Sequence, residues 1–201
     1  MTTPPPDLDQ PHLAIGLHFK RFPGRDEVWH NQEQRWYPLA EFDTHVRIYD
    51  DRVRGWFLDC ASRLPHDGFV VLMIAVAYFE GNEHYRVGRV PRPGESGRFF
   101  RDGFARAFPE LSGTPAVQTF YEDVRCGLFH DGITRERIRI SNSLPDAVAI
   151  DGDRLLISPN RVLERVQRYH ADYLAALLDP ARSDLRARFE ALWKDRWPDR
   201  I

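Results

Sequence analysis

The pattern of hydrophobic and polar positions along the chain predicts mostly helices. Between residues 44 and 64, apolar side chains recur every three or four positions, which is the period of an amphipathic helix, with Thr44 as the expected N-cap and Pro65 as its terminator. Residues 69–79 are apolar on nearly every face until Glu80, and this is typical of a helix buried at the centre of a domain. Further amphipathic helices are expected at 96–109, 158–177 and 183–193.

The segment that begins at Thr114 predicts another helix. Thr114 can cap the free amide groups, and Pro115 suits the first turn, where its missing N–H costs nothing. An apolar stripe follows, and Asp131–Gly132 ends the helix, since glycine readily adopts the left-handed conformation of a C-terminal cap. The end of this helix therefore falls within YEDVRCGLFHDGIT, residues 121–134.

After this helix the hydrophobic period changes to that of strands. RIRIS and AVAI favour strands, and Asp151–Gly152 turns the chain into LLIS. We therefore predict a small β-hairpin over about 137–158, inserted between helices. It serves either as a dimer or partner element or as an insertion that fills the surface.

The N-terminal part of the chain is less regular. Residues 1–11 are rich in proline and acidic residues, and we expect a disordered tail. HLAIGLHFKRF is compatible with a strand or a short helix, and an irregular loop with several aromatic residues is expected after it. Because no internal repeat or linker interrupts the remainder, residues 12–201 are predicted to form a single, mainly α domain.

Composition narrows the function classes. Hydrophobic residues make up 42% of the 201 residues, which predicts a sizeable core, and the net charge of −2 gives no global basic field, although a local basic cleft is compatible with it. The longest apolar run is about half the length of a membrane span, and the opening residues have neither the cationic start nor the apolar stretch of a signal peptide. We expect a cytoplasmic protein with no membrane segment, whose two cysteines are buried free thiols.

Several common catalytic patterns are missing from the sequence. No glycine-rich strand–turn–helix segment suggests a nucleotide phosphate site, and GESG lacks the pattern of a nucleophile elbow. HExxH and related paired-histidine metal motifs do not occur. The sequence therefore predicts neither a cofactor nor a metal ion.

Arg125 and His130 are the candidate reactive pair. Spacing alone does not select them, because Arg25–His30 and Arg165–His170 have the same separation. At about 100° per residue in an α-helix, five steps put two side chains roughly 140° apart. The pair at 125 and 130 differs because the helix is predicted to stop at the histidine, which frees the imidazole to turn toward the arginine.

Gly127 lies between the two residues and suits a close approach of another backbone or of a substrate. The alternative is purely structural: His130 favours the negative end of the helix dipole.

The segment VRCGLFHDGIT, after a capped helix, resembles the signature of HEPN-domain proteins, in which an arginine is followed at four to six residues by a histidine at the end of an α-helix. An apolar helix with YFEG before it and a further helix after it fit the same order, so the resemblance covers roughly residues 44–178. It implies an HEPN-like helical bundle that forms a homodimer. Many such proteins are metal-independent ribonucleases of toxin–antitoxin and phage-defence systems, and others are non-catalytic RNA-binding or scaffold modules.

The resemblance also implies roles for individual residues. His130 would be the general acid/base and Arg125 the phosphate clamp in a cleft shared by two copies, where the RNA 2′-hydroxyl attacks the adjacent phosphorus. Glu80 is the candidate for the acidic residue that the family often contributes from an earlier helix, its alternative being a solvated helix end. Asp131 is a further supporting candidate beside the histidine.

Cys126 departs from the family pattern. Active members often carry a polar residue directly after the arginine, whereas cysteine is a weak hydrogen-bond partner. The resemblance implies a metal-independent endoribonuclease that acts on RNA as a homodimer, with an antitoxin or another protein as a possible partner. The alternative is a non-catalytic HEPN-like module that binds RNA or a protein.

Overall fold

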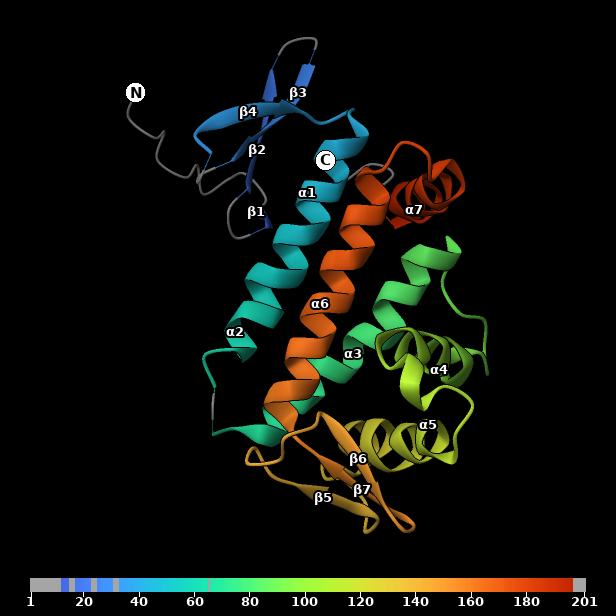
Figure 1. Cartoon of the computed structure of the whole chain (residues 1–201). Coiled ribbons are helices and arrows are strands. Elements are labelled where there is room, and N and C mark those ends of the chain that lie inside the picture. The colour runs from blue at the N-terminus through green and yellow to red at the C-terminus, as the bar shows by residue number, and fades with distance from the viewer. Residues whose placement is uncertain (1–11, 15–16, 23–24, 31–32, 65, 197–201) are drawn as a thin grey trace.

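The computed structural model describes residues 12–14, 17–22, 25–30, 33–64 and 66–196. It shows a mainly helical molecule in which long helices form a bundle and a small sheet lies at each end of it (Figure 1). The predicted mainly α fold with a small β-hairpin is confirmed at this level. The expected tail at residues 1–11 lies outside the described residues.

The first helix begins slightly earlier than its predicted cap. α1 (Phe42–Val53) continues through a π-helical segment, η1 (Arg54–Leu58), into α2 (Asp59–Ala61). Thr44, the predicted N-cap, lies inside the first turn and is buried.

The helix predicted to lose its apolar character at Glu80 continues for another two turns. α3 (Gly68–Val87) ends where Gly88 adopts a left-handed φ of 82°. Polar residues in its last turns are nevertheless buried, among them Asn82 and Glu83, because tyrosine hydroxyls bond to them. The polar residues after Glu80 therefore belong to the same helix.

One face of α3 is open to solvent, which corrects the prediction of a helix buried on nearly every face. Three of its apolar side chains are substantially exposed: Phe69 (44%), Val70 (49%) and Met73 (37%). The opposite face enters the core through Val71, Leu72 and Phe79.

α4 (Ser96–Ala107) crosses α3 closely and is followed by the short η2 (Pro109–Leu111). A β-carbon on Gly103 would lie 1.9 Å from the carbonyl oxygen of Phe79, so only glycine fits at this crossing. The helix expected at 96–109 is confirmed.

α5 (Pro115–Thr119) continues directly into a second π-helical segment, η3 (Phe120–Asp131). Gly132 ends it with a left-handed φ of 72°, as predicted. The predicted side-chain cap is wrong, because Thr114 Oγ1 donates to the carbonyl of Leu111 at 2.8 Å.

The predicted hairpin is part of a three-stranded sheet with the order β5-β7-β6. β6 (Val148–Asp151) and β7 (Arg154–Ile157) are antiparallel, and Gly152 with a φ of 61° lies in the turn between them. β5 (Ile138–Ile140) pairs with β7 in parallel, so it is an added edge strand and not a hairpin arm.

α6 (Pro159–Leu178) and α7 (Ser183–Arg196) confirm the last two predicted helices. α6 lies across the front of the bundle in Figure 1, and α7 packs on α3 and α6 near the N-terminal end of the molecule.

The N-terminal region is a sheet. Its first two strands lie in HLAIGLHFKRF and agree with the strand alternative for that segment, whereas the next two lie where the sequence predicted an irregular aromatic loop. Four antiparallel strands occur in the order β1 (His12–Ala14), β2 (Leu17–Phe22), β3 (Arg25–His30) and β4 (Arg35–Pro38). Val28 pairs with Tyr37 and Trp29 with Trp36, and because neighbouring residues of a strand point to opposite faces, the two pairs lie on opposite faces of the sheet.

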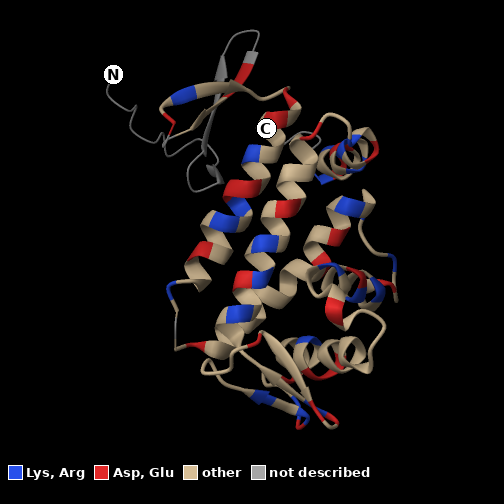
Figure 2. Ribbon diagram, viewed as in Figure 1, with Lys and Arg blue, Asp and Glu red and all other residues tan. Residues whose placement is uncertain are grey.

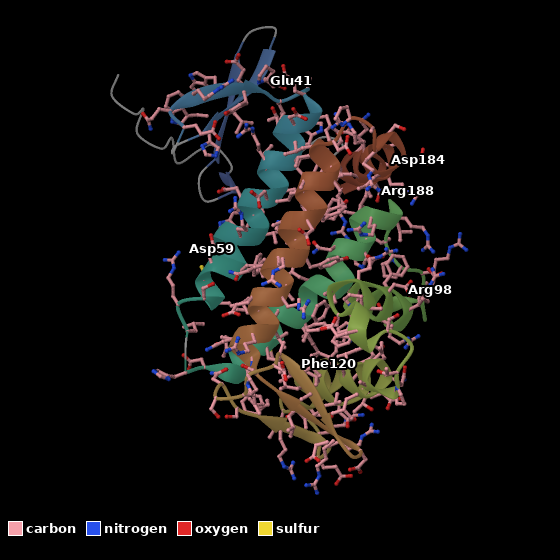
Figure 3. All side chains as sticks on the ribbon, viewed as in Figure 1. Glu41, Asp59, Arg98, Phe120, Asp184 and Arg188 are labelled. Atoms are coloured by element: carbon pink, nitrogen blue, oxygen red, sulfur yellow. The ribbon has the colours of Figure 1, made fainter. Side chains whose placement is uncertain are left out.

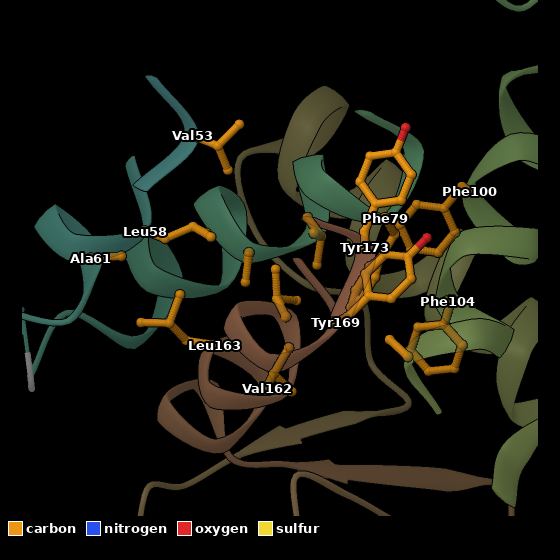
Figure 4. Close-up of a cluster of buried hydrophobic side chains, with 14 of the residues drawn as sticks. Val53, Leu58, Ala61, Phe79, Phe100, Phe104, Val162, Leu163, Tyr169 and Tyr173 are labelled. Atoms are coloured by element: carbon orange, nitrogen blue, oxygen red, sulfur yellow. The ribbon is translucent and has the colours of Figure 1, made fainter. Parts of the chain in front are cut away.

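The core is rich in aromatic rings (Figure 4). The Phe79 ring meets those of Phe100 and Phe104 edge-on, with centroids 5.5 and 5.3 Å apart, and Phe104 lies 4.6 Å from Phe120. This packing joins α3, α4 and η3, and it fixes the position of the segment that carries Arg125. Within the described part of the chain, no helix is both long enough and apolar enough to cross a membrane.

Candidate functional site

Arg125 extends from η3 toward α3 and meets Glu80 there. Arg125 Nη2 donates to Glu80 Oε2 at 3.1 Å, although the two residues are 45 positions apart in the sequence. The side chains retain only 21% and 14% exposure. Glu80 therefore lies in the middle of a helix and is partly enclosed, so its alternative interpretation as a solvated helix end is wrong.

Other groups hold the Glu80 carboxylate in place. Ser96 Oγ on α4 donates to Glu80 Oε1 at 2.7 Å, and His84 Nε2 lies 3.7 Å from the same oxygen. Burial alone would raise the pKa of Glu80, but the neighbouring His84, the Ser96 hydroxyl and the Arg125 cation lower it, and the net shift is downward. Glu80 is consequently a charged carboxylate at neutral pH and a fixed partner for the guanidinium.

The winding of η3 changes the relationship between Arg125 and His130. A π-helix bonds residue i to residue i+5, so residues five apart lie on neighbouring turns of the same side, as residues four apart do in an α-helix. Arg125 and His130 have this spacing within Phe120–Asp131. Tyr121 and Cys126 have it too, and their side chains interact. The 140° separation expected for an α-helix therefore does not apply to this pair.

His130 itself is open to solvent. In the part of the chain that the structure describes, its imidazole makes no hydrogen bond or ion pair, whereas Arg125 is bonded to Glu80. The Arg125 guanidinium also lies 5.2 Å from the ring centroid of Phe129. The structure thus brings Arg125 and Glu80 together, and it leaves the imidazole free at the end of the same helix.

Gly127 is the contact point for the chain that leaves η3. A β-carbon there would lie 2.6 Å from the carbonyl oxygen of Ile133, and Arg135 N donates to the carbonyl of Asp123 at 3.0 Å. The close backbone approach predicted for Gly127 is confirmed. It comes from the segment after His130, which folds back along the helix.

An ion pair between a half-exposed arginine and a buried aspartate, which the sequence did not indicate, holds this segment against η3. Arg137 Nε and Nη2 donate to the two carboxylate oxygens of Asp123 at 2.6 and 3.0 Å, and Asp123 is 3% exposed. The hydrogen bonds to Asp123 raise the pKa of the Arg137 guanidinium. Only the internal position of an aspartate in a helix could have drawn attention to it.

Cys126 is a free, half-buried thiol beside Tyr121. Burial and the neighbouring Cys126 both raise the pKa of the Tyr121 hydroxyl. Cys60 is also free and half-buried. The prediction of free thiols is confirmed, but neither cysteine is fully buried.

Asp131 is turned to a different partner. Its carboxylate accepts a hydrogen bond from Arg135 Nε at 3.1 Å, and both side chains are nearly half exposed. Asp131 thus forms a surface ion pair with the returning segment, and no contact with Arg125 or Glu80 is present among the described residues.

Arg165 and His170 serve separate structural contacts. Arg165 Nη2 donates to Glu110 at 2.8 Å, and the fully buried His170 lies 3.2 Å from Asp50 through Nε2. Both lie in the regular helix α6, where five residues do not share a face.

The helices carry charge of both signs. Lys and Arg positions are interspersed with Asp and Glu positions along the ribbon in Figure 2, and the labelled Asp59 and Arg98 lie on opposite sides of the bundle in Figure 3. In the described part of the chain, no three histidine, cysteine or acidic residues are grouped as metal ligands. The groups available for chemistry are the fixed pair of Arg125 and Glu80 and the exposed imidazole of His130 on the next turn of η3.

No protein-family model, no curated protein and no solved structure matches this chain.

Proposed function

We propose that the protein is an HEPN-like, metal-independent endoribonuclease that acts as a homodimer through Arg125 and His130. The observation that carries the proposal is the π-helical winding of η3, which puts these two residues on one side of the helix. Arg125 is held there by Glu80, and the imidazole of His130 is open to solvent.

The chemistry follows from these residue types. The 2′-hydroxyl of RNA loses its proton to a general base and attacks the adjacent phosphorus, and the bond from phosphorus to the 5′-oxygen breaks as that oxygen receives a proton. A histidine near neutral pKa suits both proton transfers. Two copies of His130, one from each protomer, can supply the base and the acid. The guanidinium of Arg125 stabilises the charge that develops on the phosphoryl oxygens.

Glu80 has a positioning role in this scheme. It accepts one hydrogen bond from Nη2 of Arg125, and a guanidinium has five donors in all. The remaining donors are sufficient for a bidentate contact with a phosphate. The ion pair therefore fixes the direction of the guanidinium without using up its donors.

Exposed apolar side chains beside the site support the homodimer. Met73 on α3 and Phe129 on η3 are 37% and 46% exposed, and Ile133 in the returning segment is 57% exposed. α3 and η3 pack against each other, the Phe129 ring lies 5.2 Å from the Arg125 guanidinium, and Met73 is two turns before Glu80 on α3. A second copy on this surface would bring two Arg125–His130 pairs together.

The test is cleavage of cellular RNA in the presence of EDTA by wild type, His130→Ala and Arg125→Lys. We expect wild type to cut, His130→Ala to be inactive, and Arg125→Lys to lose most activity because lysine lacks the planar fork of donors. Arg168→Ala, an exposed arginine on α6, is the matched control and should cut as wild type does. Equal cleavage by wild type and His130→Ala would remove the proposal.

A non-catalytic HEPN-like module is the second candidate. It is favoured by Cys126, whose thiol faces Tyr121, and by the existing carboxylate partner of Arg125. This candidate predicts a dimer that binds RNA or a protein partner, such as an antitoxin, without cutting RNA. Replacement of Arg125 would then reduce stability, and no nuclease activity would be present to lose.

A further inference from the structure

An open pocket of about 440 Å³ lies where the start of α3 meets β5 and the segment after η3. Its lining includes His66 and Phe69 from the α3 end, Thr134 from the returning segment, and Arg139 and Ser141 from β5 and the residue after it. Its size is within the range of small-ligand sites. None of these side chains takes part in the Arg125–Glu80 contact.

The pocket combines an aromatic face with a positive charge. Phe69 is 44% exposed, so part of its aromatic ring is accessible to a ligand in the pocket. Arg139 donates through Nη1 to the carbonyls of Glu136 and Ile138, and within the described residues it has no carboxylate partner. Its positive charge is therefore not neutralised, in contrast to Arg135 and Arg137, which pair with acidic residues.

The pocket is connected to the candidate active site by a short piece of chain. Thr134 follows His130 by four residues, which span at most about 14 Å when fully extended. The intervening backbone is packed on Gly127, so the connection is fixed rather than loose. A strand of RNA with its reacting phosphate at Arg125 and His130 would have neighbouring nucleotides within reach of the pocket.

We propose that this pocket binds one nucleotide of single-stranded RNA beside the bond that is cut, with its base stacked on Phe69 and its phosphate on Arg139. The inference rests on the proposed function, which supplies RNA as the substrate. Base stacking on an aromatic side chain tolerates every base, and an arginine binds phosphate through its fork of donors. A bare anion would use Arg139 alone, whereas a nucleotide explains the aromatic face as well.

The first measurement is the affinity of the full-length protein for AMP by isothermal titration calorimetry. Phe69→Leu keeps the apolar volume and removes the aromatic face, and Arg139→Gln removes the charge. Each substitution should lower the affinity for AMP about tenfold. Arg154→Gln, an exposed arginine on the adjacent strand β7 that does not line the pocket, is the control and should bind as wild type does. If wild type does not bind AMP, or if all variants bind it equally, the proposal that this pocket binds a nucleotide is wrong.

The second measurement distinguishes a nucleotide of RNA from a free nucleotide. A fluorescein-labelled RNA octamer is titrated against the same variants in a His130→Ala background, which prevents cleavage. Phe69→Leu and Arg139→Gln should weaken the binding of the RNA. Arg139→Gln should also lower the slope of the logarithm of the binding constant against the logarithm of the salt concentration by about one. If both variants lose affinity for AMP but keep full affinity for RNA, the pocket binds a free nucleotide and is not a subsite for RNA.

The cleavage assay separates failure of the pocket from failure of the nuclease. If wild type cuts RNA and the two pocket variants, with unchanged thermal stability, have unchanged KM, the pocket inference is wrong and the nuclease stands. If the affinities for AMP and for RNA both fall on replacement of Phe69 and Arg139 but wild type never cuts RNA, the pocket inference is supported and the proposed nuclease activity is wrong.

Discussion

Arg125 Nη2 donates to Glu80 Oε2 at 3.1 Å and thereby links η3 to α3 across 45 residues of sequence. The pair is partly enclosed, and Ser96 and His84 flank the carboxylate. Such a pair is costly to break because one charge is left without its partner in a poorly hydrated place. The contact therefore stabilises the packing of two helices and determines where the guanidinium points.

Replacement of Glu80 by glutamine should lower the free energy of unfolding at pH 7 by about 1–3 kcal/mol. Because the folded-state pKa of Glu80 lies below the ordinary value of 4.5, its contribution is fully present above that value and is lost as the pH falls through the folded-state pKa. The difference between wild type and Glu80→Gln should therefore shrink below pH 4.5. Urea unfolding at several pH values measures both effects.

Glu122→Gln is the matched control for this prediction. Glu122 also pairs with an arginine, Arg137, at 3.3 Å, but its side chain is 44% exposed. An exposed pair is worth at most about 1 kcal/mol, so the control should change stability much less. Equal losses for the two variants would show that enclosure of the Glu80–Arg125 pair has no energetic consequence.

Gly103→Ala should be strongly destabilising, by about 3 kcal/mol or more, because the new β-carbon would meet the backbone of Phe79 at 1.9 Å and force α3 and α4 apart. Gly81→Ala offers the opposite case. It is also a helical glycine, but the nearest atom is a Tyr78 ring carbon at 4.0 Å, so alanine should stabilise α3 by about 0.5–1 kcal/mol. Urea unfolding of both variants tests the crossing, and similar values for the two would contradict the described geometry.

Gly127→Ala should affect both stability and RNA cleavage. The added methyl group would lie 2.6 Å from the carbonyl oxygen of Ile133, and the segment after His130 must move away at a cost of about 1–3 kcal/mol. Because that segment holds the end of η3, the imidazole should shift and cleavage should fall more than it does for Glu122→Gln. The check is a comparison of kcat at a temperature where both variants are folded. Unchanged cleavage would mean that the position of this segment is irrelevant to the chemistry.

The sequence predicted those parts of the fold that depend on local patterns. The structure confirms the features that have local causes. These are the hydrophobic periods of α6 and α7, the helix end at Gly132 and the turn at Gly152. The parallel pairing of β5 with β7 and the Asp123–Arg137 pair join distant segments, so neither leaves a local pattern. In the N-terminal sheet, a strand was one of two alternatives for the segment that contains β1 and β2, but β3 and β4 were missed because they are short and rich in charged and aromatic residues.

The candidate site was only partly accessible from the sequence. Glu80 was selected by resemblance, and its contact with Arg125 appears only in the structure. The α-helical angle that separates residues five apart was applied to a segment that is π-helical. A π-helix has no recognised composition, because its i→i+5 bonds depend on what packs around it. The residues could therefore be chosen from the sequence, but their relative placement could not.

The homodimer can be tested through the apolar surface beside the site. Met73→Glu combined with Phe129→Glu introduces two charges where a second copy is proposed to pack, so the protein should become a monomer and lose cleavage. Leu178→Glu, at the far end of α6 and 51% exposed, is the matched control and should leave a dimer. Analytical ultracentrifugation gives the oligomeric state. A double variant that stays dimeric would place the interface elsewhere.

Cys126 is the residue whose replacement best separates an active nuclease from a non-catalytic module. Its thiol interacts with Tyr121 on the preceding turn, next to Arg125, and a thiol is a weak hydrogen-bond donor. Cys126→Ser keeps the size and provides a stronger donor. A net hydrogen bond of about 0.5–1.5 kcal/mol expressed in the transition state would raise the cleavage rate roughly 2- to 10-fold. If Cys126→Ser cuts no faster than wild type while His130→Ala abolishes cleavage, the protein is a nuclease in which the residue after the arginine has no catalytic role.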